Sequence, residues 1–276
     1  DRGWGIAGNG AGGSLARRLQ CLRSQALPVS CLCSQFEILQ TMQYATSAMK
    51  HEHLKAGRLQ AGLTQVRAAQ RLGVSQPYLS QLERGDRPVT AELARRAAAL
   101  YGLPATALPI PEAAPGKVPA DPDRFARQLA GLGYPGFRHL RGRKANPATV
   151  LLEALRQPDL EVRLTEALPW VVLTYPDLNW SWLVSQTKLH DVQNRLGFVV
   201  ATARAVAAAD GRRQPTLEPL AAVEQHLERA RLAREDTLCR ESMSPPERNW
   251  LGTTRSALAR HWNLLTGLTA EQLSYA

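Results

Sequence analysis

The sequence predicts an all-α protein of two domains, and three observations support this prediction. Residues 63–87 carry the signals of two short helices joined by a tight turn. Residues 108–122 contain a dense run of prolines, which is typical of a semi-rigid linker between domains. Beyond that run, apolar residues recur at helical spacing, and no segment sustains the alternation of a half-buried strand. A length of 276 residues fits two domains of about 100–200 residues each.

The two short helices are delimited by capping residues. Thr64 can cap the first helix by accepting a hydrogen bond from a free backbone N–H in the first turn. Gly73 can end that helix, where a left-handed residue is needed. Ser75 then caps a second helix almost at once, and Gly85 ends it. Two short helices joined by a glycine-containing turn form a helix-turn-helix.

Each of these helices has an apolar face and a polar face. Val66, Ala69 and Leu72 follow one another at helical spacing on the first helix, and Leu79 and Leu82 form the buried stripe of the second. In a helix-turn-helix the second helix enters the major groove of DNA. We expect its outward residues to be Gln76, Pro77, Tyr78, Ser80, Gln81 and Arg84, with a single acid, Glu83, on that face.

The types of these outward residues suit nucleic acid. A glutamine amide can accept a hydrogen bond from adenine N6 and donate one to N7, while hydroxyl and guanidinium groups suit bases or phosphates. The spaced residues of the region match a known pattern: Gly62-Leu63-Thr64-Gln65, Ala69, Gly73-Val74-Ser75-Gln76, Leu79-Ser80 and Leu82-Glu83-Arg84-Gly85. With these residues, positions 54–104 resemble the repressor-type helix-turn-helix family that includes the lambda-phage repressor and Cro, often called the XRE family.

The resemblance implies a lambda-repressor-like bundle of four or five helices. It also implies that Gln65 touches phosphate and braces Gln76, and that Gln76, Ser80 and Gln81 face bases. Pro77 departs from the polar residue that is frequent at its position in the family. The expected base contacts are therefore Gln76, Pro77, Ser80 and Gln81, and the expected phosphate contacts are Thr64, Gln65, Tyr78, Arg84 and Arg87.

The distribution of charge agrees with this reading. The net charge is +10, and residues 49–110 hold nine Lys or Arg against four acids. Residues 111–276 are nearly balanced, with 21 Lys or Arg against 18 acids. The basic excess is thus concentrated around the motif, as a phosphate-facing surface requires.

Residues 1–48 are expected to be a disordered extension, with Met42 and Met49 as candidate starts. A G-x-G-x-x-G string at 8–13 suggests dinucleotide binding, but the strands that this fingerprint needs around it are missing from the pattern. An organelle transit segment is an alternative for this acid-poor stretch. The expected domains are then 49–107 for the helix-turn-helix, 108–122 for the linker and 123–276 for a larger helical domain.

Within 123–276 we expect one long helix over about 179–210, which buries Leu189, and another over about 217–238. Pro169 is expected to interrupt a helix, and Ser244 to Glu247 read as a capping box. The basic run 138–144 is interpreted as a solvated loop, with a second phosphate contact as the alternative. Cys239 is expected on a polar helix, and neither this cysteine nor the histidines form a pattern of metal ligands.

No catalytic motif, cofactor fingerprint or metal site is found, so an enzyme is not expected. No apolar run reaches the roughly 18 residues of a membrane span, and the cysteines are expected to be reduced in the cytoplasm.

The pattern favours a transcriptional regulator of the repressor type that binds double-stranded DNA at a pseudo-palindromic operator. The second domain is expected to form a homodimer and to receive a signal or a protein partner. The alternative is an antitoxin that represses its own operon and binds a toxin through that domain.

Overall fold

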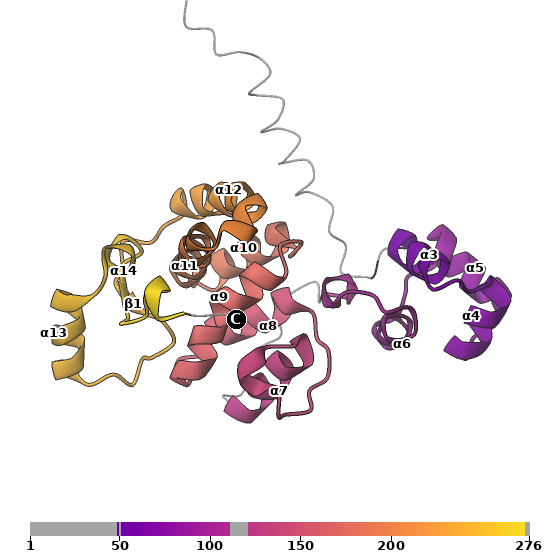
Figure 1. Cartoon of the computed structure of the whole chain (residues 1–276), viewed down its shortest axis with the longest axis horizontal. Coiled ribbons are helices and arrows are strands. Elements are labelled where there is room, and N and C mark those ends of the chain that lie inside the picture. Colours follow the sequence, from indigo (N-terminus) through magenta and orange to yellow (C-terminus); the bar gives the residue numbers. More distant parts are fainter. Residues whose placement is uncertain (1–48, 50, 111–120, 274–276) are drawn as a thin grey trace, which may run out of the picture. The chain divides into compact units, whose positions relative to one another are not determined.

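The computed structural model describes residue 49, residues 51–110 and residues 121–273. The predictions for residues 1–48 and for most of the linker lie outside the described residues. The described part of the chain is mostly helical, with a single pair of two-residue strands (Figure 1). The all-α prediction is therefore confirmed. None of the described helices is long and apolar enough to cross a lipid bilayer.

The first group of helices forms the predicted bundle. Its elements are α3 (His51–Gln60), α4 (Gln65–Leu72), α5 (Gln76–Arg84), α6 (Ala91–Tyr101) and the short 3-10 helix η1 (Ala105–Ala107). A continuous apolar cluster joins them, and Leu54, Leu72, Leu79 and Leu82 are among its fully buried side chains. Leu79 and Leu82 lie inside the bundle as predicted.

The predicted ends of α4 and α5 are confirmed. The Thr64 hydroxyl accepts a hydrogen bond from the N–H of Arg67, and the Ser75 hydroxyl accepts one from Tyr78, both at 3.3 Å. Gly73 and Gly85 end the two helices at φ 67° and 82°, the left-handed region that costs glycine little. These four residues set the length of each helix and the sharp turn between them.

The predicted apolar face of α4 is wrong at one position. Val66 is 56% exposed, whereas Ala68, Ala69 and Leu72 are buried. Two residues along an α-helix correspond to about 200° of rotation, so residues 66 and 68 point to opposite sides. The bundle interior takes the side of Ala68.

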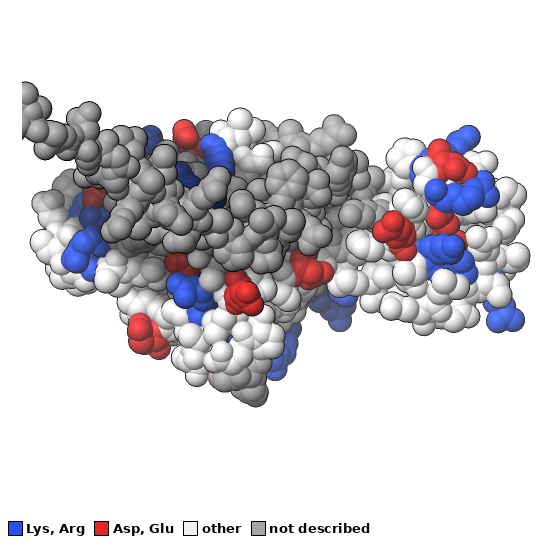
Figure 2. All heavy atoms as spheres, turned by 90° about the horizontal axis from the view of Figure 1, so that it is seen from above, with Lys and Arg blue, Asp and Glu red and all other residues white. Residues whose placement is uncertain are grey.

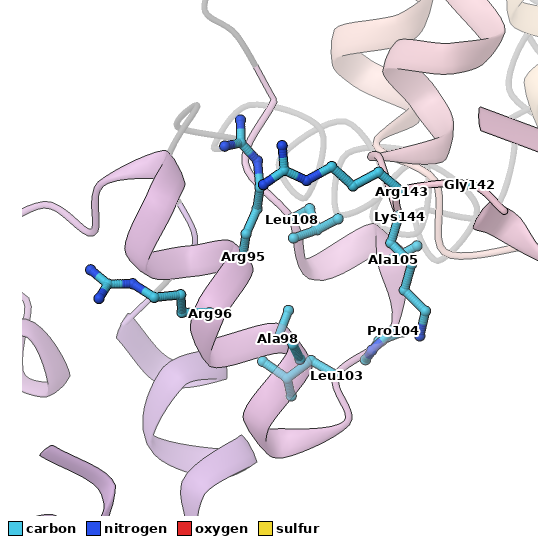
Figure 3. Close-up of a pocket in the computed structure, with 11 residues that line it drawn as sticks. Arg95, Arg96, Ala98, Leu103, Pro104, Ala105, Leu108, Gly142, Arg143 and Lys144 are labelled. Carbon is cyan, nitrogen blue, oxygen red and sulfur yellow. The ribbon is translucent and has the colours of Figure 1, made fainter. Parts of the chain in front are cut away.

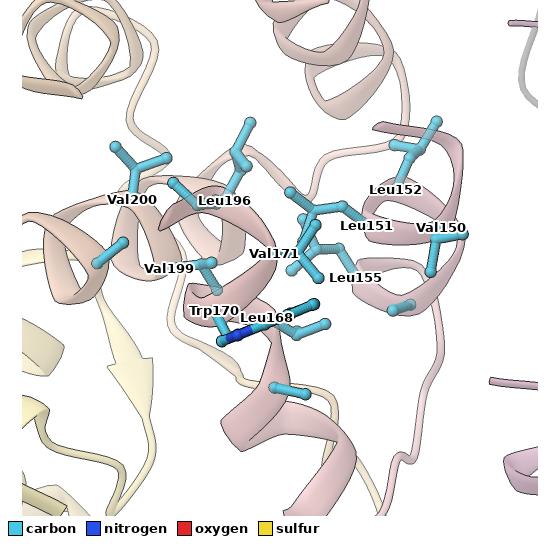
Figure 4. Close-up of a cluster of buried hydrophobic side chains, with 14 of the residues drawn as sticks. Val150, Leu151, Leu152, Leu155, Leu168, Trp170, Val171, Leu196, Val199 and Val200 are labelled. Carbon is cyan, nitrogen blue, oxygen red and sulfur yellow. The ribbon is translucent and has the colours of Figure 1, made fainter. Parts of the chain in front are cut away.

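The second group of helices follows the linker. Its elements are α7 (Pro122–Leu132), η2 (Pro135–Phe137), α8 (Pro147–Leu155), α9 (Val162–Thr174), α10 (Trp180–Leu189), α11 (Gln193–Ala209), η3 (Gly211–Thr216), α12 (Leu217–Glu228), β1 (Asp236–Thr237), α13 (Pro245–Thr254), α14 (Ala257–His261), β2 (Leu264–Leu265) and η4 (Ala270–Gln272). Leucines and valines of α8, α9 and α11 meet in the centre of this domain (Figure 4).

Two helix predictions in this domain are corrected. Pro169 does not interrupt a helix, because α9 continues through it to Thr174. The long helix expected over 179–210 is two helices, α10 and α11. Asp191 adopts a left-handed φ of 55° and the N–H of Val192 bonds back to the carbonyl of Thr187, which ends α10. Leu189, expected to be buried, is 69% exposed at this break.

The region after α12 also differs from the prediction. The helix expected to reach residue 238 ends at Glu228, and β1 pairs in parallel with β2 a little further on. Cys239 lies in the loop after β1, fully buried, and not on a polar helix. The helix predicted after Ser244 is present as α13, but the Ser244 side chain makes no capping bond.

Arg195 ties this late region to the helical core. Its guanidinium is buried and donates to both carboxylate oxygens of Asp236, at 2.7 and 2.8 Å. It also donates to Glu241 and to the backbone carbonyls of Leu155 and Gln157. A buried guanidinium needs its donors satisfied, and here β1, the segment after it and the end of α8 supply the acceptors for a donor on α11. One side chain therefore fixes three distant segments.

Gly197 allows a second close contact in the same domain. A Cβ at this position of α11 would lie inside the van der Waals distance of three ring atoms of Trp262, which is fully buried. The indole ring therefore lies directly on the backbone of α11. This contact holds the segment between α14 and β2 against the core.

We expect Gly197→Ala to destabilise the second domain by about 1–3 kcal/mol, because the ring must move to admit the methyl group. Gly252→Ala in α13 is the matched control, since a Cβ there meets nothing within 4 Å. Urea denaturation followed by tryptophan fluorescence measures both, because residues 49–110 contain no tryptophan. Equal stability of the two variants would contradict the packing described here.

Candidate nucleic-acid interface

The predicted base-contacting residues lie together along α5. Gln76, Ser80 and Gln81 are half-buried at the surface of this helix, and Pro77 is exposed in its first turn. Since Ser75 caps the helix and Gly85 ends it, these residues stand on about two turns of regular helix. Such a helix presents side chains to a groove with little loss of conformational entropy on binding.

Glu83 was expected on the outer face of α5, and that prediction is wrong. Its carboxylate is buried and receives two hydrogen bonds from Arg58 of α3, at 2.6 and 3.0 Å. Arg58 is buried too, and it also donates to the carbonyl of Leu63 at 2.8 Å. The bidentate pair thus joins α3 to α5, and the bond to Leu63 adds the segment that precedes α4.

A chain of side-chain hydrogen bonds runs from this pair to the first residue of α5. Gln65 Nε2 donates to Glu83 Oε2 at 2.9 Å, and Gln76 Nε2 donates to Gln65 Oε1 at 2.8 Å. The direction of this chain follows from chemistry, because a carboxylate can only accept hydrogen bonds. Gln65 must turn its NH₂ toward Glu83, so its oxygen faces Gln76. The brace between Gln65 and Gln76 that the family resemblance implied is present.

The chain leaves Gln76 with one free N–H and a free carbonyl oxygen. Its other N–H is held by Gln65, which fixes the plane of the amide. One donor and one acceptor in a fixed plane are what a bidentate contact to adenine N7 and N6 requires. The buried ion pair therefore prepares the orientation of a side chain at the surface.

The ionisation of Glu83 is secured by its partners. Burial alone would raise the pKa of this carboxyl, but the hydrogen bonds from Arg58 and Gln65 outweigh burial and hold the pKa below its ordinary value. The hydrogen bond to Glu83 likewise raises the pKa of Arg58. Both groups are thus charged at neutral pH, as the direction of the amide chain requires.

The predicted phosphate-contacting residues lie at the start of α4 and around α5. Thr64 and Gln65 stand at the N-terminus of α4, where free N–H groups and the helix dipole favour an anion. Arg84 is exposed and pairs with Asp86 at 2.8 Å, and it also donates to Ser80. An exposed pair of this kind is worth about 1 kcal/mol or less, so phosphate can displace it.

Arg87 is exposed, and its guanidinium lies 5.8 Å from the ring centre of Tyr78. The stacking places the charge beside α5 while leaving its donors free. Figure 2 shows one face of the molecule, on which basic and acidic side chains are interspersed. On the face that it shows, the described atoms form no continuous basic surface.

Comparison with known proteins agrees with this geometry. Residues 54–108 match a family model described as "Helix-turn-helix". This part of the chain is a helix-turn-helix domain. The match confirms the resemblance to the XRE family for the bundle, and it supports DNA binding by that bundle. No curated protein and no solved structure matches the chain.

Arg58 is the residue of this site that sequence reasoning missed. Arg58 lies in the last turn of α3, where a basic residue ordinarily faces solvent near the helix end, and arginine is mostly a surface residue. One signal was available, because α5 places Glu83 next to Leu82 and only four residues after Leu79. An acid so close to a buried stripe requires a cation from elsewhere in the bundle.

We expect Glu83→Gln to destabilise the helix-turn-helix domain by about 3–5 kcal/mol, because it leaves the Arg58 charge buried and unpaired. Asp86→Asn, which removes the partner of Arg84, is the control and should cost less than about 1 kcal/mol. Amide hydrogen exchange over residues 51–101 measures both effects in the full chain. Similar exchange rates in the two variants would refute the importance of the buried pair.

Proposed function

We propose that the chain is a sequence-specific transcription regulator of the repressor type, in which α5 of the helix-turn-helix domain reads the major groove of DNA. The observation that carries this proposal is the hydrogen-bonded chain that ends at Gln76. It holds an exposed donor and acceptor in one plane at the start of α5, at the place where a recognition helix contacts bases. Ser80 and Gln81 then reach further bases, while Pro77 offers only an apolar contact.

Phosphate contacts complete the proposed interface. Thr64 and Gln65 offer the N-terminus of α4, and Arg84, Arg87 and the hydroxyl of Tyr78 offer donors beside α5. Contacts of this kind set the register of the protein on the duplex, whereas base contacts carry the sequence information. The two groups of residues therefore have different signatures in binding experiments.

Gln76→Ala should weaken binding to the preferred sequence by about 1–3 kcal/mol and leave binding to random DNA unchanged. The preferred duplex is obtained by sequencing the DNA that the protein retains from a random pool. Arg87→Ala is the contrasting variant, and it should weaken both complexes and lower the salt slope by about one. Fluorescence anisotropy at several salt concentrations measures the affinities of the unaltered chain and of both variants for both duplexes. Equal weakening of both duplexes by Gln76→Ala would show that α5 does not read bases.

The second domain is proposed to hold two copies of the chain together. A single helix-turn-helix covers one half-site, and dimers place two of them about one DNA turn apart on a pseudo-palindromic operator. Among the tryptophans of this domain, Trp170 and Trp262 belong to the core, whereas Trp250 on α13 is 61% exposed. An aromatic side chain exposed to this extent suits an interface, so we place the contact between copies at α13.

The full chain should sediment as a dimer and bind two half-sites much more tightly than one. A fragment ending at Pro111 should be monomeric and still recognise a half-site. Trp250→Ser should weaken the dimer, whereas Leu189→Ser removes an equally exposed apolar side chain from α10 and serves as the control. Analytical ultracentrifugation measures all four forms. A monomeric full chain that co-purifies with a second protein would instead favour the antitoxin alternative.

A further inference from the structure

A hollow of about 400 Å³ lies beside α6, on residues that the proposed DNA contacts do not use (Figure 3). Its size falls in the range of small-molecule sites, about 300–1,000 Å³. Its walls come from α6, from the segment through η1 and from a short strip before α8. The lining residues are Arg95, Arg96, Ala98, Ala99, Leu103, Pro104, Ala105, Leu108, Gly142, Arg143 and Lys144.

The charged residues that line the hollow are all cations, although Glu92, outside the lining, lies 3.8 Å from the guanidinium of Arg96. Arg95, Arg96, Arg143 and Lys144 line it, and no carboxylate does. Arg96 is held by a hydrogen bond to the carbonyl of Leu72. Within the part of the chain that the structure describes, Arg95, Arg143 and Lys144 are exposed and pair with no acid. Like charges around one hollow repel each other, and a bound anion relieves that repulsion.

The floor of the hollow is apolar. Ala98, Leu103, Ala105 and Leu108 line it, and all four are buried against the cores on either side of this segment. Figure 3 shows the leucines between the guanidinium groups at one side and Lys144 at the other. A ligand that fits has an anionic head for the cations and a short apolar body for this floor.

The walls of the hollow are fixed by backbone packing and by hydrogen bonds. Gly142 and Gly131 of α7 touch backbone to backbone, and a Cβ on Gly142 would collide with the carbonyl of Arg127. The Asn146 amide donates to the carbonyls of Thr106 and Leu108, at 3.2 and 2.7 Å. The strip that carries Arg143 and Lys144 is thereby held to α7, while the floor is held to the start of α8. A site held in place in this way loses little entropy when it binds.

The hollow adjoins the helix-turn-helix through Arg96, at the end of α4 that is opposite to Thr64 and Gln65. Arg96 hydrogen-bonds to the carbonyl of Leu72, at the C-terminal end of α4. Thr64 and Gln65, which are proposed to contact phosphate, stand at the N-terminal end of the same helix. Eight residues of α-helix span about 12 Å. None of the four cations of the hollow is among the residues proposed to contact DNA.

We propose that this hollow binds a small amphipathic anion, with a phosphate or carboxylate head between Arg95 and Arg143, an apolar chain over Leu103 and Leu108, and Lys144 as a further cation at the far side of the leucines. This site is additional to the proposed DNA interface. Since α6 belongs to the helix-turn-helix bundle and the strip 142–144 belongs to the second domain, an occupant contacts both. The ligand thus gives the second domain a means of influencing the bundle.

The test uses the full chain and n-octyl phosphate as the probe, below its micelle concentration, in isothermal titration calorimetry. We expect saturable binding of one probe per chain, and at least tenfold weaker binding of octanol, which lacks the charge, and of inorganic phosphate, which lacks the chain. The double variant Arg143→Gln/Lys144→Gln should bind octyl phosphate at least tenfold more weakly. The matched control is Arg138→Gln/Arg141→Gln, which removes two charges from the same loop outside the hollow.

Absence of saturable binding to the unaltered chain, or equal loss in the two double variants, would overturn the proposal. A second measurement tests duplex DNA as the true occupant. Arg143→Gln/Lys144→Gln should leave the salt slope for random duplex DNA unchanged, whereas a decrease of about two would assign these cations to phosphates of DNA and also overturn it. Failure of the unaltered chain to bind any duplex concerns the proposed function and leaves the calorimetric result intact.

Discussion

The helix-turn-helix domain depends on one buried charge, the carboxylate of Glu83. It accepts hydrogen bonds from Arg58 and Gln65, and because it has no donor it imposes one direction on the amides that follow. The orientation of Gln76 at the surface is the end of this chain. Packing alone does not define such an orientation, since the two ends of an amide have nearly the same shape. The chemistry of an interior residue thus determines which groups the surface offers to a base.

Local signals in the sequence were sufficient to place α4 and α5. Capping hydroxyls at Thr64 and Ser75 act within three residues along the chain, and Gly73 and Gly85 act on the turn in which they stand. Such interactions need no knowledge of the rest of the fold. The expected positions of the reading residues on α5 followed directly. Their roles toward bases and phosphates stay a prediction.

Interactions between distant segments were the ones that sequence patterns did not give. Asp191 ends α10 in a left-handed conformation, although the apolar pattern continues across it into α11. Pro169 stands within α9, although proline is usually a helix breaker. In each case the surrounding core, formed by residues far away in the sequence, outweighs the local preference. Cys239 is likewise buried by residues far away in the sequence, since it lies beside Arg195. Its burial raises the pKa of the thiol to about 11.

Arg58 and Arg195 show why buried arginines escape a pattern-based analysis. Each lies in a helix among residues of ordinary type, and each is buried because carboxylates and carbonyls from other segments surround it. Replacing a buried ion pair by apolar residues of similar volume is often neutral or stabilising, so such pairs are weak evidence for stability. An apolar pair at positions 58 and 83 has no acceptor for Gln65, and Gln76 then loses its fixed plane. The ion pair therefore fixes the donor-to-acceptor direction of this hydrogen-bond chain, and the direction determines which groups Gln76 presents at the surface of α5.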